Sequence, residues 1–264
     1  MNKILRAVLL TVLSTVLIWS LAGIGMTVSD YKKADAIYDK VRDDSFHAPD
    51  CSPETASAEI PEEYFPEASV DLEALEDTNP EVVGWLWIPD TEINFPLLRS
   101  SDNWKYLSLS YDLQQTNSGS IFMDFRNSAN FSDDNTIIYG HNMKSGGMFG
   151  KLKNFADSDY LNEHPELYIF TETQILKYRI FAAYKTKADS ASYTASFSEE
   201  PVFLDFIEYV KNCAGENIAG APAEYARLIT LSTCTSEQRD GRFVVHACFV
   251  ASKRLSGAYS GTAS

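Results

Sequence analysis

The sequence predicts a mainly β domain, arranged as a mixed or closed barrel, behind an apolar N-terminal segment. After Asn79 and Pro80, short runs rich in β-branched and aromatic residues alternate with turn residues. A single later helical pattern, near residues 200–213, interrupts these runs, whereas a βαβ sheet would alternate strands with helices throughout. The eight expected strands span residues 84–89, 93–99, 120–124, 135–142, 166–171, 174–187, 225–234 and 241–255.

The composition is that of a folded, acidic protein. Hydrophobic residues make up 45% and charged residues 22%, as in ordinary globular domains, which excludes global disorder. The net charge is −15, and residues 29–80 alone carry 15 acidic and 4 basic side chains. Because an acidic surface repels phosphate backbones, no nucleic-acid partner is expected.

The N-terminal segment is typical of a membrane anchor. Residues 7–28 form an uncharged, mostly apolar run of 22 residues, long enough to cross a hydrocarbon core of ~30 Å as a helix. Lys3 and Arg6 precede it, which favours a cytoplasmic N-terminus. The alternative is a signal peptide cleaved after the small residues around Ser20 and Ala22. In both cases the rest of the chain lies outside the cytoplasm.

Two short helices are expected between this segment and the β-rich region. Residues 29–45 place Tyr31, Ala34, Tyr38 and Val41 on one stripe, with Ser29 or Asp30 as the cap. Residues 46–66 contain four prolines among acidic residues and are typical of an extended linker. A second helix is expected at 69–77 with Ser69 as its cap.

These patterns divide the chain into four parts. They are a cytoplasmic tip with a transmembrane anchor (1–28), an acidic helical and proline-containing stalk (29–68), a β-rich domain (69–257) and a flexible tail (258–264).

The chemistry concentrates near the end of the chain. Because strand side chains alternate between faces, Ser232 and Cys234 share one face of their strand. If residues 235–241 form a hairpin loop, Cys234 lies directly opposite Arg242, with Cβ atoms about 5 Å apart. An arginine in that position can activate a thiol or stabilise an oxyanion.

A thiol nucleophile also needs a proton-transfer partner, usually histidine. In the same register His246 lies opposite Thr230, about 13 Å from Cys234 along the strand, which is too far. His47 falls in the linker and His164 in a turn before a proline. His141 ends a strand and precedes a glycine-containing loop, and is therefore the favoured partner.

The other cysteines suggest no further chemistry. Cys213 and Cys248 are interpreted as small buried apolar residues, and Cys51 as a linker residue. Whether any of these three forms a disulfide stays open. Since the sequence has neither a CxxC pair nor an HExxH motif, a zinc site has no support. No metal and no cofactor are assigned to the chain.

Together these motifs resemble the class B sortases. The resemblance rests on TLSTC at residues 230–234, on Arg242 eight residues after the cysteine, and on YGHNM at 139–143. It extends over about residues 69–255, and further similar segments occur at 79–89, 93–96, 119–124 and 148–152.

The resemblance implies a closed eight-stranded β-barrel with N-terminal helices and one long helix before the cysteine strand. It implies a cell-surface transpeptidase in which Cys234 attacks the carbonyl after threonine of an Asn-Pro-x-Thr-type signal and forms a thioester. His141 would protonate the departing amine, and Arg242, in preference to Arg239, would stabilise the oxyanion. An amine of a peptidoglycan precursor or of a pilin would then resolve the thioester.

The resemblance also suggests substrate contacts in the groove, and it leaves two alternatives. Thr235 stands where some class B members carry an acid, so any role of that acid is missing. The alternatives are an exported Cys/His hydrolase of wall peptides and a catalytically silent, sortase-like binding module. The expected substrate-binding residues are Asn94, Leu98, Tyr139, Tyr193, Ser232 and Thr233.

Overall fold

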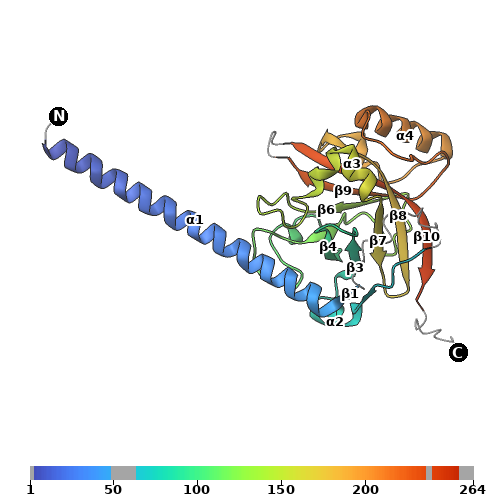
Figure 1. Cartoon of the computed structure of the whole chain (residues 1–264), viewed down its shortest axis with the longest axis horizontal. Coiled ribbons are helices and arrows are strands. Elements are labelled where there is room, and N and C mark those ends of the chain that lie inside the picture. The colour runs from blue at the N-terminus through green and yellow to red at the C-terminus, as the bar shows by residue number, and fades with distance from the viewer. Residues whose placement is uncertain (1–2, 49–63, 236–239, 256–264) are drawn as a thin grey trace.

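The computed structural model describes residues 3–48, 64–235 and 240–255. Its centre is a closed barrel with the strand order β10-β8-β7-β3-β4-β5-β6-β9 (Figure 1). Each barrel strand overlaps one of the eight predicted runs, so the predicted barrel is confirmed. The strands are β3 (Val82–Trp87), β4 (Asn94–Leu98), β5 (Ile121–Met123), β6 (Asn135–Tyr139), β7 (Glu166–Phe170), β8 (Gln174–Lys187), β9 (Leu228–Cys234) and β10 (Gly241–Arg254).

The barrel is mixed rather than antiparallel throughout. Strand β4 pairs with β5 in parallel, and β6 pairs with β9 in parallel, while the other neighbours are antiparallel. Parallel neighbours need a long connection. The connection from β6 to β9 contains the 3₁₀ turns η3 (Leu152–Ala156) and η4 (Ala191–Tyr193) and the helices α3 (Ser158–Glu163) and α4 (Glu200–Ala214), besides strands β7 and β8.

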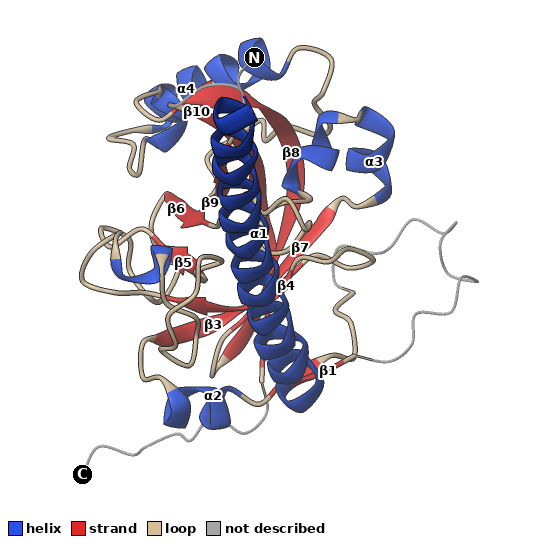
Figure 2. Cartoon of the chain, turned by 90° about the vertical axis from the view of Figure 1, so that its left-hand side faces the viewer, coloured by secondary structure: helices blue, strands red, loops and turns tan. Residues whose placement is uncertain are grey.

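Helix α4 covers one outer face of the barrel. It lies close to the predicted range, and Phe203, Phe206, Ile207 and Val210 are its buried residues. These side chains pack in one apolar cluster with residues of β8 and β10 such as Phe181 and Val244. Helix α2 (Leu72–Thr78) lies at the opposite end of the molecule (Figure 2).

The N-terminal region forms one continuous helix, α1 (Lys3–Ser45), which projects far from the barrel (Figure 1). The predicted helix start at Ser29 or Asp30 was therefore wrong. No proline interrupts the helical pattern there, and Asp30 instead accepts a hydrogen bond from the backbone N–H of Asn117. An 18-residue stretch within Leu9–Ser45 has a mean hydropathy of 2.0 and is fully exposed, so its length and composition suit a membrane span.

The second half of α1 packs on the barrel. Ala34, Tyr38 and Val41 are buried, as the predicted stripe requires, and Tyr31 is half-buried. The Tyr38 ring meets Phe95 of β4 edge to face, with centroids 5.6 Å apart. The helix is thus attached to the barrel through apolar and aromatic contacts.

The segment after α1 differs from the prediction at both of its described ends. Phe46–His47 form strand β1, which pairs with β2 (Ser69–Val70), so His47 lies in a strand rather than in a linker. Ser69 is consequently a strand residue, and the cap of α2 is Asp71, whose carboxylate accepts from the Ala74 N–H. Three of the linker prolines, Cys51 and the expected tail lie outside the described residues.

His246 belongs to a buried polar cluster and not to a reactive site. Its Nδ1 lies 3.0 Å from Thr230 Oγ1 and its Nε2 lies 3.0 Å from the Tyr184 hydroxyl. The ring is fully buried, and this burial lowers the pKa of His246 from 6.5 to about 3. A neutral imidazole is therefore part of the folded barrel.

This burial predicts an acid sensitivity. Stability contributed by neutral His246 is complete above its unfolded pKa of 6.5 and decreases as the pH falls from 6.5 towards 3, because only the unfolded chain then binds the proton. In His246→Gln the side chain still donates and accepts but does not titrate in this range. Urea unfolding at pH 7 and pH 4.5 should show a smaller loss of stability in this variant than in the wild type. Equal losses of stability in the variant and the wild type would contradict the assignment of His246 as a buried, neutral side chain.

Candidate active site

The parallel pairing of β6 with β9 builds the candidate site. Because the carboxyl ends of parallel neighbours lie at the same barrel edge, the residues that follow Tyr139 and those near Cys234 come together. The cavity at this edge, here called the Cys234 cavity, is partly apolar. It is lined by Asn103, Leu107, Phe122, Tyr139, Gly140, His141, Ser232, Thr233, Cys234 and Arg242.

The structure confirms the predicted register between the last two strands. Cys234 of β9 lies directly opposite Arg242 of β10, and Thr230 lies opposite His246. Cys234 is exposed, while Arg242 is half-buried and donates from Nη1 to the Gly241 carbonyl at 2.9 Å. A thiol and a permanent cation therefore share the mouth of the cavity.

His141 reaches the cavity from the end of β6. Its Nε2 lies 2.8 Å from the carbonyl oxygen of Leu107, in the 3₁₀ turn η2 (Lys105–Leu107). Since a carbonyl only accepts, Nε2 carries a hydrogen, and Nδ1 stays available for proton exchange.

Two hydrogen bonds continue the β6–β9 seam beyond the strands. The Gly140 N–H donates to the Ser232 carbonyl at 3.1 Å, and Asn142 Nδ2 donates to the Cys234 carbonyl at 2.8 Å. A Cβ atom on Gly140 would lie 2.5 Å from Ile121 Cδ1 and 2.8 Å from Phe149 Cγ, so a larger residue would require both side chains to shift. The backbones that carry the imidazole and the thiol are thereby joined directly.

Tyrosines form the wall next to Cys234. The Tyr193 hydroxyl lies 2.7 Å from Ser232 Oγ, and its ring stacks on Tyr139 with centroids 6.4 Å apart. The Tyr139 hydroxyl donates to Asp124 at 2.9 Å. Burial raises the pKa of both tyrosines above the ordinary value, so this wall presents neutral phenols.

A bidentate ion pair supports that wall. Arg126 Nε and Nη2 donate to the two Asp124 oxygens at 2.8 and 2.9 Å, and Asn103 Nδ2 donates to the same carboxylate at 3.1 Å. Burial by itself would raise the pKa of Asp124, but the hydrogen bonds from Arg126 and Tyr139 hold it below the ordinary value. The carboxylate is therefore ionised, and it accepts hydrogen bonds from Arg126, Asn103 and Tyr139.

The predicted substrate-binding residues fall into two groups. Tyr139, Ser232 and Thr233 line the cavity, and Tyr193 lies against Ser232. Thr233 Oγ1 is buried and has no hydrogen-bond partner among the described residues.

Asn94 and Leu98 do not belong to the cavity, and their predicted place there was wrong. Asn94 is buried and accepts from the Trp85 indole N–H, and Leu98 is fully buried in the barrel. Both lie within β4, where alternation and closure of the barrel direct them to packing rather than to the groove.

Sequence reasoning missed several contributors to the site, among them Phe122 and Gly140, which line the cavity. Asn103 and Leu107 lie in a loop whose position depends on distant contacts, and no local pattern marks them. Asn142 stands inside the YGHNM motif, directly after the histidine, and that adjacency was a usable signal. The rival residue Arg239 lies outside the described residues.

Cys213 is exposed, so its interpretation as a buried residue was wrong. It lies in the last turn of α4, beyond the last buried residue, Val210. Cys248 is buried as predicted.

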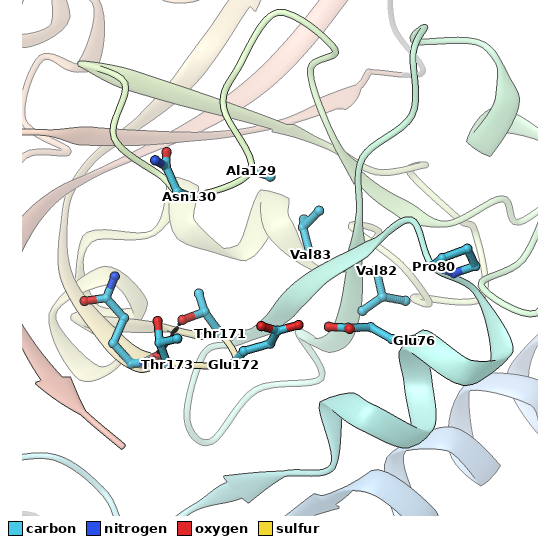
Figure 3. A pocket seen from close by; sticks show the side chains of 10 residues that line it. Glu76, Pro80, Val82, Val83, Ala129, Asn130, Thr171, Glu172 and Thr173 are labelled. Atoms are coloured by element: carbon cyan, nitrogen blue, oxygen red, sulfur yellow. Dashed lines mark hydrogen bonds between the residues drawn. The ribbon is translucent and has the colours of Figure 1, made fainter. Parts of the chain in front are cut away.

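A second hollow lies between α2 and the β7–β8 turn (Figure 3). The carboxyl groups of Glu76 and Glu172 face each other across it. Burial, and then the hydrogen bond with Glu172, raises the pKa of Glu76 to about 7. The described residues that line this hollow include neither a cysteine nor a histidine, so they lack the groups for nucleophilic acyl transfer.

An exposed thiol, a guanidinium and an imidazole around one cavity are the groups of a cysteine-dependent acyl-transfer enzyme. Residues 86–250 match the sortase domain family model. The chain belongs to the sortase family and is a cysteine transpeptidase of that class.

Relatives and solved structures agree with this assignment. Sortase B of Listeria monocytogenes is 35% identical over 229 residues, which cover 86% of this chain and 89% of the relative. The crystal structure of Bacillus anthracis sortase B in complex with AAEK1 is similar at a TM-score of 0.69 and 29% identity, covering 84% and 99% of the two chains. The Staphylococcus aureus sortase B–substrate complex is similar at a TM-score of 0.63 and 29% sequence identity, over 70% of this chain and 85% of the other.

The exposure of the thiols predicts their reactivity. Iodoacetamide should modify Cys234 and Cys213 in the folded protein, and Cys248 at least about tenfold more slowly, because it is buried and burial raises its pKa. Peptide mapping by mass spectrometry measures each site. In denaturant the three should react alike, and rapid labelling of Cys248 in the folded chain would contradict the structure.

Proposed function

We propose that this chain is a membrane-anchored sortase that cuts an Asn-Pro-x-Thr-type sorting signal after threonine and transfers the new acyl group to an amine. The observation that carries the proposal is the meeting of Cys234, Arg242 and His141 at one cavity. The relationship to sortase B enzymes, one of them solved as a substrate complex, supports it.

The first half of the reaction forms a thioester. Cys234 Sγ adds to the threonine carbonyl carbon while its proton passes to His141, and the negative charge develops on the carbonyl oxygen near Arg242. The C–N bond then breaks, and His141 returns the proton to the departing amine. The products are an acyl-enzyme and the free C-terminal fragment.

The second half reverses the roles of the same groups. An incoming amine adds to the thioester carbonyl, His141 removes its extra proton, and the C–S bond breaks to release Cys234. The net result is one amide bond broken and one formed. The acceptor we propose is an amine of a peptidoglycan precursor, with a pilin lysine as the other candidate.

The cavity wall suggests how the signal binds. Thr233 Oγ1 has no partner among the described residues, while Ser232 and the stacked rings of Tyr139 and Tyr193 offer hydroxyl and aromatic surface. Neutral phenols suit an uncharged peptide such as Asn-Pro-x-Thr. We assign these four residues to substrate binding.

The long helix supports a surface location. We assign residues 1–28 to a cytoplasmic tip and a single membrane span, residues 29–68 to the connection, residues 69–257 to the catalytic domain outside the cell and 258–264 to a tail. The exposed apolar half of α1 and the basic residues Lys3 and Arg6 favour this topology.

The full chain in detergent micelles, mixed with an Asn-Pro-x-Thr-Gly or Asn-Pro-x-Thr-Asn peptide, tests the proposal. Intact mass spectrometry should detect an acyl adduct on Cys234 that converts to a peptide–amine product when oligoglycine is added. An adduct that yields only acid would favour the hydrolase alternative. No adduct from a folded chain with a reactive thiol would contradict the proposed signal and favour the silent binding module.

Three variants test the assigned roles in the same assay. Cys234→Ala should abolish the adduct while leaving the urea midpoint nearly unchanged, since the side chain is exposed. His141→Gln should slow transfer by about 100-fold or more. Arg242→Lys keeps the charge but loses the planar fork, and should slow transfer by at least about tenfold. Full activity of Cys234→Ala would exclude the mechanism.

A further inference from the structure

We propose that helix α1 orients His141, with Tyr38 as the positioning residue that acts through the 116–120 turn and the Leu107 carbonyl. The inference rests on the proposed role of His141. It adds a link between the membrane helix and the imidazole, assembled from consecutive contacts.

The first link is the hydrogen bond between His141 Nε2 and the Leu107 carbonyl, 2.8 Å long. Among the described residues this is the only hydrogen bond of the His141 ring, and no carboxylate or amide side chain orients it. The position of one backbone carbonyl therefore decides which ring nitrogen carries the hydrogen and which one faces the reaction.

The second link is the turn that holds the Leu107 segment. The Ser120 N–H donates to the Tyr106 carbonyl at 2.9 Å, and Ser120 Oγ donates to the Leu109 carbonyl at 2.7 Å. These two bonds bracket Leu107. Gly119 has φ +56°, and a Cβ there would lie 2.5 Å from the Tyr106 oxygen and 2.9 Å from the Leu107 oxygen. The turn thus packs so closely on the Leu107 carbonyl that any side chain at Gly119 would collide with it.

The third link joins this turn to α1. The Tyr38 hydroxyl donates to the Gly119 carbonyl at 2.7 Å and lies 2.9 Å from Ser120 Oγ. Tyr38 is 2% exposed, and burial raises its pKa, so the hydroxyl keeps its proton. About two turns earlier on the helix, Asp30 accepts from the Asn117 N–H at 3.0 Å. Helix α1 therefore holds the turn at two points.

The same helix contains the apolar stretch that ends at Val28. Tyr38 is ten residues further along, or about 15 Å at 1.5 Å per residue, with no break in the helix between them. A rigid element of this kind transmits its position to the turn, and the turn transmits it to the imidazole. A loss of the Tyr38 hydroxyl should therefore change the orientation of His141 without removing any group from the Cys234 cavity.

Tyr38→Phe in the full chain tests the proposal, with Tyr31→Phe as its matched control. Both substitutions remove one hydroxyl from the same helix, but the hydroxyl of the half-buried Tyr31 makes no hydrogen bond within the described part of the chain. The readouts are kcat and KM for peptide transfer, and ¹⁵N NMR of histidine-labelled protein, with the His141 signals assigned from His141→Gln. The NMR readout reports which ring nitrogen carries the hydrogen.

In the wild type and in Tyr31→Phe we expect His141 with its hydrogen on Nε2. In Tyr38→Phe we expect a mixture of the two tautomers and a kcat about fivefold lower, the size of one hydrogen bond, with KM within about twofold. An unchanged tautomer in folded Tyr38→Phe would overturn the proposal, whatever happens to kcat. So would an equal effect of Tyr31→Phe.

A second variant covers the case in which Tyr38→Phe does not fold. Ser120→Ala removes the hydroxyl that binds the Leu109 carbonyl and should produce the same mixture of tautomers. Because the NMR readout needs no substrate, it separates this proposal from the proposed function. If the variants change the tautomer of His141 but the wild type never transfers the peptide, the positioning role of Tyr38 is supported and the proposed substrate is wrong. An unchanged tautomer in Ser120→Ala would overturn the link.

Discussion

The parallel pairing of β6 with β9 is the constraint on which the site depends. It brings the carboxyl ends of two strands to the same barrel edge, although residues 140–227 separate these strands in the chain. The imidazole follows one of the strands and the thiol ends the other. The bonds from Gly140 to Ser232 and from Asn142 to Cys234 extend the seam past the strand ends, so the relative position of the two groups is a property of the barrel.

The antiparallel pairing of β9 with β10 adds the cation. Its register places Arg242 opposite Cys234, and the same register places His246 opposite Thr230, buried beneath α4. Strands β9 and β10 thus carry the reactive groups at one end and a buried histidine that only stabilises the fold further along. Burial keeps His246 neutral, whereas the cavity at the strand end keeps its thiol accessible.

The wall of the cavity combines neutral and charged groups in separate layers. Tyr139 lines the cavity and stacks on Tyr193, while the Asp124–Arg126 pair binds the Tyr139 hydroxyl from behind. Because the ion pair is bidentate and its carboxylate is buried, it holds the wall in place without bringing a free charge to the peptide. Helix α1 supports the His141 side of the cavity through Tyr38 and the turn beside Leu107.

Local patterns in the sequence determined the strands, helix α4, the apolar first half of α1 and the pairing of Cys234 with Arg242. Each depends on side-chain periodicity or on a short hairpin, which neighbouring residues encode by themselves. Only the tertiary structure decided that α1 runs on through Ser29, that Asn94 and Leu98 are packing residues, and that Asn103 and Leu107 line the cavity. The physical reason is that these outcomes depend on contacts between segments far apart in the chain, which closure of the barrel brings together.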